Sequence, residues 1–400
     1  MHPRHQLGFL NAAHFACHYF LLIFPTAAIA IEHEGQRDYG SVLALGTPVY
    51  VCFALATLPA GWLGDRFDGD RLIGVFFAGC GAAAIAVAFA PDDFWLMAGL
   101  GLLGLFAALY HPVGLAMITK LSDRPGHALA VNGVFGNLGL AAAALCTGLL
   151  ADWFGWRSAF LIPGLVAVAI ALSHGRRHRT AAPIAVPSDG VTPSAVTLPR
   201  STQFRVVGVV LLAALFGGFV FNGVSISLPK LFDERLGAMA QGLSGIGGYS
   251  ALVFAVAAFA QLPIGVLLDR FGGRPVLLTL LAFEVAALVA TAMAGGALVL
   301  PSALVTVTLM FAGIPITGWL IAKYVATSWR GRVFALEYVL ALGMSAMIVP
   351  LMAVLLRSGY GFDRQYLFFA LSAAVVVAAA LVLPWVPAGR RAIDKTGVRP

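Results

Sequence analysis

Charged residues are scarce in this chain. They make up 11% of its 400 residues, whereas a soluble domain carries roughly 25%. A water-soluble protein needs a charged, solvated surface, and this sequence has too few charges to form one. The hydrophobic share is 60%, and the apolar residues occur in blocks long enough to cross a bilayer, which takes about 20 helical residues. The composition therefore excludes a soluble globule and predicts an integral membrane protein.

Motifs for disulfides, nucleotides and cofactors are also lacking. All four cysteines lie inside apolar blocks, which argues against a disulfide framework. The glycine-rich segment at 242–248 has neither a preceding strand nor a following Lys-Ser/Thr pair, so a contact between helices explains it better than a phosphate-binding loop. We expect no enzyme activity, no cofactor or resident metal centre, no nucleic-acid partner and no ATP-driven pump within this chain. No selectivity-filter repeat or ring of charges indicates a channel.

Twelve apolar blocks predict twelve transmembrane helices. They lie at about 7–31, 41–64, 72–90, 94–119, 127–150, 157–173, 205–229, 243–268, 275–294, 297–322, 332–356 and 364–386. The first block is too long for the core of a signal peptide, and we expect it to be retained. The predicted parts are an N-terminal six-helix bundle (1–173), a basic cytoplasmic linker (174–204), a C-terminal six-helix bundle (205–386) and a cytoplasmic tail (387–400).

Positive charge is distributed unevenly between the two sides of the membrane. Of the 25 Lys and Arg residues, 19 fall on the side of the N-terminus and six on the opposite side. Because positively charged loops stay in the cytoplasm, we expect both termini to be cytoplasmic. The predicted location is the inner (plasma) membrane, with lipid around a multi-pass, monomeric protein.

Two similar loops lie 204 residues apart. Gly-Trp-Leu-Gly-Asp-Arg-Phe at 61–67 closes the second block, and Gly-Val-Leu-Leu-Asp-Arg-Phe at 265–271 closes the eighth. Such an internal repeat predicts two related halves with a pathway on the axis between them.

These features resemble the major facilitator superfamily over nearly the whole chain. The signature after its second helix is matched by Gly61, Leu63, Asp65 and Arg66, although Asp68, Gly69 and Asp70 depart from it. The second copy matches at Gly265, Asp269, Arg270, Gly272 and Arg274. The resemblance implies an all-α membrane fold of two pseudo-symmetric six-helix bundles, with helices one, four, seven and ten around a cavity. Helix five lacks the Gly-Pro pair of the drug-antiporter branch, and Tyr110-His111-Pro112 is similar to the fosmidomycin-resistance group.

The repeated loops are candidates for a cytoplasmic gate. A carboxylate at the end of one helix can meet Arg side chains and the positive N-terminus of another helix. Contacts made in only one arrangement of the bundles bias the equilibrium between arrangements, so we expect this latch to form when the protein opens outward. The alternative is that the loops only fix topology. The gate candidates are Gly61, Asp65, Arg66, Arg71, Gly265, Asp269, Arg270 and Arg274.

Polar residues within the first block share one helical face. Asn11, His14 and His18 recur at i, i+3 and i+7, and Cys17 borders them. Polar groups in lipid are costly, so such a stripe faces a cavity or a neighbouring helix. Histidine exchanges protons near neutral pH. The stripe therefore suits the handling of a substrate or of protons, and the alternatives are packing and a soft metal ion held with Cys17.

Other polar residues within the spans extend the candidate set. Tyr110 and His111 precede Pro112, which can kink the fourth helix. A carboxyl group one turn into helix eleven, Glu337, suits a proton carrier, or it pairs with basic residues nearby. Asn132, Asn137, Asn222 and Tyr338 complete the candidates for substrate or proton handling. Glu284 lies in the middle of the ninth span, and its role has no explanation from the sequence.

The sequence thus predicts a secondary active transporter that moves a small organic molecule by alternating access. The coupling ion is predicted to be the proton, with His14, His18 and Glu337 as candidate carriers. One alternative is an importer of a soft, copper-like metal ion, which would add Met344 and Met347 as ligands. The other is a membrane receptor or assembly factor with the same fold and no flux.

Overall fold

The protein is built almost entirely from helices. The computed structural model describes residues 3–35, 37–178 and 199–384, and no strand occurs within these ranges. Eleven helical segments of the described part are long and apolar enough to cross a membrane, and Ser158–His174 is a shorter twelfth. The predicted all-α membrane architecture is confirmed.

The first half contains eight helices of the described chain. They are α1 (Pro3–Glu34), α2 (Tyr39–Ala44), α3 (Thr47–Gly64), α4 (Gly69–Ala88), α5 (Asp93–Ala107), α6 (Tyr110–Leu121), α7 (Pro125–Phe154) and α8 (Ser158–His178). Asp38 caps α2 by accepting hydrogen bonds from the hydroxyl and the amide of Ser41, at 2.6 and 2.9 Å. These bonds hold the pKa of Asp38 below its usual value.

The second half repeats this pattern. It comprises α9 (Arg200–Leu236), η1 (Gly237–Met239), α10 (Gly242–Ala257), η2 (Ala258–Gln261), α11 (Ile264–Phe271), α12 (Gly273–Met293), η3 (Gly296–Leu298), α13 (Val299–Tyr324), α14 (Thr327–Arg357) and α15 (Phe362–Ala380). Helices α8 and α9 extend into both ends of the segment 174–204 that was predicted as linker. Basic residues near a helix C-terminus favour the helical state, which explains the later end of α8. Residues 179–198 of the predicted linker and the predicted tail 387–400 lie outside the described residues.

Three spans are broken one turn before a proline. Helix α2 stops four residues before Pro48, α5 gives way to α6 around Ala108, four residues before Pro112, and η2 precedes Pro263. Proline has no N–H to bond the carbonyl four residues earlier, so the helix is interrupted there. The predicted kink in the fourth span is confirmed, and it makes Tyr110 the first residue of α6.

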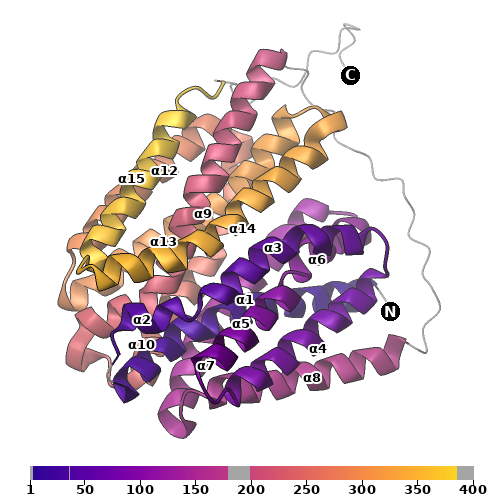
Figure 1. Cartoon of the computed structure of the whole chain (residues 1–400). Coiled ribbons are helices and arrows are strands. Elements are labelled where there is room, and N and C mark those ends of the chain that lie inside the picture. Colours follow the sequence, from indigo (N-terminus) through magenta and orange to yellow (C-terminus); the bar gives the residue numbers. More distant parts are fainter. Residues whose placement is uncertain (1–2, 36, 179–198, 385–400) are drawn as a thin grey trace, which may run out of the picture.

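Helix pairing repeats between the halves. In the first half α1 packs against α7, α3 against α5 and α4 against α8. The equivalent spans of the second half pair in the same way, as α9 with α14, α10 with α13 and α12 with α15. Figure 1 shows the two halves as separate groups of ribbons, one indigo to magenta and the other pink to yellow.

The halves meet through two equivalent helix contacts. Helix α7 packs on α10, and α14 packs on α2 and α3, so the fifth span meets the eighth and the second meets the eleventh. A twofold exchange of the halves converts one contact into the other. At the first contact a Cβ on Gly148 would lie 2.3 Å from the Leu243 oxygen, and one on Gly247 would lie 2.3 Å from the Ala144 oxygen. The prediction that segment 242–248 serves helix packing is confirmed.

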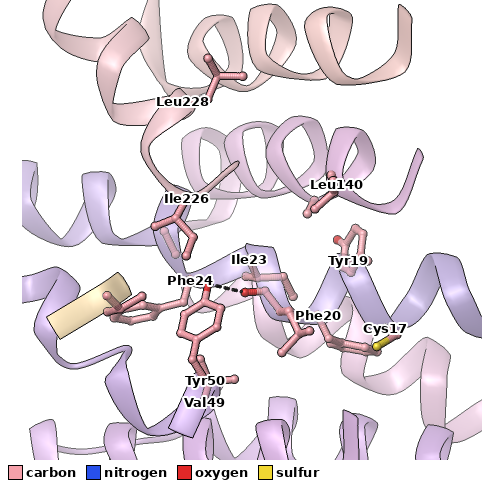
Figure 2. Packing of buried hydrophobic residues seen from close by; sticks show 14 of the residues in the cluster. Cys17, Tyr19, Phe20, Ile23, Phe24, Val49, Tyr50, Leu140, Ile226 and Leu228 are labelled. Carbon is pink, nitrogen blue, oxygen red and sulfur yellow. Dashed lines mark hydrogen bonds between the residues drawn. The ribbon is translucent and has the colours of Figure 1, made fainter. Parts of the chain in front are cut away.

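A large apolar core crosses from one half to the other. It includes Phe24 of α1, Tyr50 of α3, and Ile226 and Leu228 of α9 (Figure 2). The Tyr50 hydroxyl donates to the Leu21 carbonyl at 2.9 Å, which holds α3 against α1. The residues that the second half contributes to this core lie toward the end of the molecule where α1 and α9 finish, which we call the Glu32 end.

A second apolar cluster lies within the second half alone. Among its members are Val206 of α9, Leu268 of α11 and Ile316 of α13. It lies toward the opposite end, which we call the Asp65 end after the loop between α3 and α4. In Figure 1 the ribbons of the two halves meet around α2 and α10 and separate toward the end where α9 begins. Contact between the halves is thus concentrated at the Glu32 end.

Candidate functional site

Three imidazole rings converge inside the first half. His14 and His18 lie one turn apart on α1, and His111 lies in the first turn of α6. The ring centroids are 4.9 Å apart for His14 and His18, 5.2 Å for His14 and His111, and 5.4 Å for His18 and His111. One ring nitrogen of each histidine lies within 4.8 Å of one from each of the others. We call these residues the histidine cluster.

Asn132 of α7 connects the histidine cluster to its surroundings. Its backbone carbonyl accepts a hydrogen bond from His14 Nδ1 at 2.8 Å, and its side-chain oxygen accepts one from the Tyr110 hydroxyl at 3.0 Å. Its side-chain nitrogen donates to Asn11 Oδ1 at 2.9 Å. Asn132 is fully buried, so these bonds satisfy groups that water does not reach. The network ties α1, α6 and α7 into one unit.

The surroundings of His14 depend on a small residue and a stacked ring. A Cβ on Gly136 of α7 would lie 2.7 Å from the His14 ring, so only glycine leaves room for the imidazole there. The Tyr110 ring stacks on the imidazole, with ring centroids 4.8 Å apart and an interplanar angle of 22°. The imidazole is therefore held by packing as well as by its hydrogen bond.

Several nitrogens of the histidine cluster have no partner in the described part of the chain. Among the described residues, His14 Nε2 and both ring nitrogens of His111 make no hydrogen bond, although each residue is only 7% exposed. His18 is half-buried. Buried polar atoms normally find partners. This cluster can therefore hydrogen-bond or coordinate a bound molecule or ion.

Two further candidates of the first half lie apart from this network. The Cys17 thiol is buried and donates to the Ala107 carbonyl at 3.6 Å, so it faces α5. Asn137 is buried on α7, and its side-chain nitrogen has no partner among the described residues. Helical spacing alone did not separate the face of Cys17 from that of the histidines.

The polar candidates of the second half lie outside the histidine network. Asn222 donates to the Gly218 carbonyl of its own helix at 2.7 Å and to the Ala341 carbonyl of α14 at 3.5 Å. Glu337 of α14 is half-buried, and its carboxyl group lies near Thr317 of α13. Its neighbour Tyr338 is 40% exposed. No described residue of this half joins the histidine cluster through a hydrogen bond.

Within the described residues, the basic side chains nearby have partners other than Glu337. Arg330 donates to the Val325 carbonyl at 3.2 and 3.3 Å, and the Lys323 ammonium lies 4.3 Å from the centre of the Trp319 ring. No ion pair of Glu337 occurs among the described residues. The second acidic residue of the spans, Glu284, is buried on α12.

The first gate loop is exposed at the Asp65 end. Gly61 lies close to α6, because a Cβ at this position would lie 3.8 Å from Pro112. The Arg66 guanidinium lies 4.0 Å from the centre of the Trp62 ring, and the Arg71 amide donates to Asp68 at 2.9 Å. The Asp65 carboxylate is exposed and makes no hydrogen bond or ion pair within the described part of the chain.

The second gate loop also bonds within its own half. Asp269 accepts a hydrogen bond from the Trp319 indole at 3.1 Å, and Arg274 donates to the Leu383 carbonyl at 3.2 Å. Arg270 lies over the ring of Phe271, and Gly265 has open space around it. No hydrogen bond or ion pair between the described residues joins the two gate loops, so the predicted latch stays a prediction.

An ion cluster at the Glu32 end links the halves instead. Lys230 of α9 is buried, and its ammonium lies 2.5 Å from Glu32 of α1 and 2.7 Å from Asp233. Asp233 also lies 3.5 Å from His33 Nε2. Sequence reasoning missed this cluster because it treated these charges only as markers of topology. The position of Lys230 directly after Pro229, at the end of an apolar block, was the available signal.

A second polar link at the Glu32 end uses a helix N-terminus. Asp152, in the last turn of α7, accepts hydrogen bonds from the backbone amides of Leu243 and Ser244 at 3.1 and 2.7 Å. These amides belong to the first turn of α10, where N–H groups have no partner within the helix. Asp152 therefore caps a helix of the opposite half, and the favourable dipole adds to the contact.

The amino-acid sequence matches the profile of a known family. The profile described as Major Facilitator Superfamily matches residues 7–336. The chain belongs to the Major Facilitator Superfamily. Members of this superfamily are membrane transporters and not enzymes, which agrees with the fold and with the expectation from the sequence.

Curated relatives within the superfamily share limited identity with this chain. Puromycin resistance protein pur8 of Streptomyces alboniger is 32% identical over 140 residues, covering 33% of this chain and 28% of that protein. Niacin transporter NiaP of Acinetobacter baylyi is 29% identical over 135 residues, covering 33% and 30%. The multidrug transporter mfsC of Aspergillus fumigatus is 27% identical over 298 residues, covering 61% and 57%. The chain thus spans less than two thirds of the length of these relatives.

Solved structures of the superfamily share the fold over nearly the full chain. A bacterial homolog to the human lysosomal transporter Spinster, in an inward-facing and occupied conformation, has a TM-score of 0.74 at 16% identity. The match covers 96% of this chain and 99% of the homolog's chain. The E. coli fucose:proton symporter FucP has a TM-score of 0.62 at 14% identity and covers 96% and 100%. At such identities the likeness shows the fold.

Proposed function

We propose that this protein is a secondary active transporter that moves a small organic molecule by alternating access of its two halves. The observation that carries the proposal is the distribution of contacts between the halves. Among the described residues, the ion pairs and hydrogen bonds that join them lie at the Glu32 end, while the gate loops at the Asp65 end bond within their own halves. This is the arrangement that an alternating-access protein adopts when one side is closed and the other open.

The open side is the cytoplasm in this proposal. The order of loops in the sequence assigns 19 of the 25 Lys and Arg residues to the side of the N-terminus, and positively charged loops remain cytoplasmic. The described start of α1 lies at the Asp65 end, where Gln6 donates to Asp70 at 2.8 and 2.9 Å. Both termini and the basic linker then face the cytoplasm of a cell whose inner membrane holds the protein. The likeness to Spinster homolog structures described as inward-facing supports this orientation. In this state the gate loops bond within their own halves, and they form their latch in the opposite, outward-open state.

The histidine cluster and its network form the substrate-contacting surface of the first half. Asn11, His14, Tyr110 and His111 supply amide, imidazole and phenol groups, with no carboxylate or guanidinium among them. Such a surface suits a neutral or amphipathic molecule, because a polyanion needs Arg contacts within the membrane. Relatives named for puromycin, niacin and multiple drugs support a small organic substrate. Asn137, Asn222 and Tyr338 remain candidates for the opposite walls.

Proton coupling is assigned to Glu337. The half-buried carboxyl group can be protonated or anionic, and Thr317, which lies near it, belongs to a different helix. Protonation therefore changes a contact between α13 and α14, and α14 packs on the first half. The neighbour FucP, named as a fucose:proton symporter, supports the choice of the proton. We prefer Glu337 to His14 and His18, because three imidazoles so close together disfavour a second positive charge.

Two measurements test the proposal. A ligand-stabilisation screen of purified protein is expected to find organic molecules that raise the melting temperature, and His14→Ala and His18→Ala should remove that rise. Hits whose effect survives both changes would refute the substrate surface. In proteoliposomes with an imposed pH gradient, the hits should accumulate with the wild-type protein, and Glu337→Gln should retain exchange but lose accumulation. Binding without any flux would instead support the receptor or assembly-factor alternative.

A further inference from the structure

We propose that His14, His18 and His111 together bind one divalent transition-metal ion of the Zn²⁺ class. Each histidine offers one ring nitrogen within 4.8 Å of those of the other two. Imidazole is a ligand that suits Zn²⁺, Co²⁺, Ni²⁺ and Cu²⁺. Three protein ligands with the fourth position open form a recognised zinc arrangement. This inference concerns the ligand of the cluster and does not depend on which organic molecule the protein transports.

The hydrogen bond of His14 prepares its ring for a metal ion. A carbonyl oxygen can only accept, so the contact at 2.8 Å requires the proton on His14 Nδ1, and the neutral ring keeps a lone pair on Nε2. Metal-ligating histidines commonly donate their other ring N–H to a carbonyl, which fixes the tautomer and the ring orientation. Asn132 supplies that carbonyl here. Its own position is fixed by the hydrogen bonds to Tyr110 and Asn11.

The free nitrogens of the cluster point to a ligand outside the protein chain. His14 Nε2 and both nitrogens of His111 are buried and have no partner among the described residues. Packing alone explains a buried histidine when its nitrogens are hydrogen-bonded to neighbouring helices, and that condition is not met by His111. A metal ion would take one lone pair from each ring, which gives a partner to His14 Nε2 and to one nitrogen of His111.

The separations allow a metal site after small side-chain movements. With Zn–N bonds near 2.0 Å, the nitrogens of a tetrahedral site lie about 3.3 Å apart. The rings of the cluster must therefore close by up to about 1.5 Å, which rotation of the half-buried His18 side chain can provide. His18 also offers the entry path, since His14 and His111 are more deeply buried. Water or a substrate atom would fill the fourth position.

The geometry corrects the metal hypothesis drawn from sequence. That hypothesis placed Cys17 and methionines beside the helix-one histidines, but the Cys17 thiol faces Ala107 and Met347 is 63% exposed. The third ligand is instead His111, from a different span. The site therefore lacks sulfur, and its chemistry fits a borderline divalent ion better than a soft, monovalent copper ion.

Cobalt binding tests the inference directly. Purified protein without a polyhistidine tag would be dialysed free of metal and titrated with Co²⁺, whose four-coordinate complexes absorb strongly in the visible range. We expect one equivalent of Co²⁺ with this spectrum, displaced by Zn²⁺. His14→Ala, His18→Ala and His111→Ala should each remove the spectrum and weaken binding at least about 10-fold, since even outer partners of a ligand change affinity by that factor.

Matched controls separate this site from other histidines and cysteines. Cys17→Ser, on the same helix turn, and His33→Ala, in the acidic group at the Glu32 end, should leave the spectrum and the stoichiometry unchanged. If the alanine variants fail to fold, His18→Asn at the half-buried position carries the test. A six-coordinate spectrum in the wild-type protein, or binding that survives all three histidine changes, would overturn the proposal. That result would leave the proposed function intact, because transport of an organic substrate can be measured separately in the presence of EDTA, which removes metal ions.

Discussion

Lys230 of the second half lies 2.5 Å from Glu32 of the first half and is itself only 5% exposed. The same ammonium contacts Asp233 at 2.7 Å and faces the Tyr39 ring at 5.3 Å. A buried cation held by carboxylates from both halves stabilises the state in which this end is closed. The contact between Lys230 and Glu32 must break whenever the protein opens at the Glu32 end. Its free energy therefore contributes to the equilibrium between the two states.

Lys230→Met is expected to favour opening of the Glu32 end. Removing one partner of a buried ion pair costs roughly 3–5 kcal/mol, because the remaining charges lose their compensation. Spin-label distances across the Glu32 end should lengthen for a large share of molecules. Arg37→Gln is the matched control, because Arg37 pairs with Asp93 within one half and both are about half exposed. Such surface pairs contribute about 0–1 kcal/mol, and an equal effect of both variants would contradict the assignment.

Gly247→Val should prevent the halves from closing at the Glu32 end. Its Cβ would collide with the Ala144 carbonyl oxygen at 2.3 Å, and helix backbones cannot yield as a flexible side chain does. We expect loss of transport with retained expression, and longer spin-label distances between α7 and α10. The adjacent Gly248 has open space around it, so Gly248→Ala should transport normally. Normal transport by Gly247→Val would show that this contact is not needed for the cycle.

Asp152→Ala should weaken the closed end through the lost cap of α10. Loss of a capping carboxylate costs about 0.5–2 kcal/mol, and here the cap and the helix belong to different halves. The population open at the Glu32 end should therefore rise, as measured by the labelling rate of a cysteine introduced on that side. Asp92→Ala removes a cap within one half, where Asp92 accepts from the Trp95 amide. It should lower the melting temperature and leave the labelling rate unchanged.

Tyr110→Phe should weaken ligand binding at the histidine cluster. The change removes the donor to Asn132 Oδ1 and leaves a buried acceptor unpaired, which costs about 1–3 kcal/mol. Asn132 then holds His14 and Asn11 less firmly. The affinity of the protein for the organic molecules found in the ligand-stabilisation screen should fall about 10-fold. Tyr50→Phe is the control, since its hydroxyl bonds the Leu21 carbonyl in the apolar core. It should destabilise the fold without a selective loss of affinity, and a similar loss in both variants would argue against the network.

Local sequence patterns predicted the fold well because lipid imposes strong local rules. A backbone in a bilayer must satisfy its own hydrogen bonds, so each apolar block forms a helix whose length follows from composition. The break before Pro112 also followed from one residue, since proline removes a specific backbone donor. The stripe of Asn11, His14 and His18 followed from helical spacing within a single span.

Contacts between spans required the three-dimensional arrangement. The sequence placed His14 and His111 in separate helices, and the packing of α1 on α6 and α7 showed that their rings lie 5.2 Å apart while Cys17 faces away. Likewise, Lys230 and Glu32 lie 198 residues apart in the chain, and nothing in their local sequence specifies the partner. The spans, the repeat and the uneven charge could be predicted from sequence, because each depends on the chemistry of neighbouring residues. Which polar groups meet, and which end is closed, emerged from the packed helices, because those outcomes depend on how each helix is rotated against its neighbours.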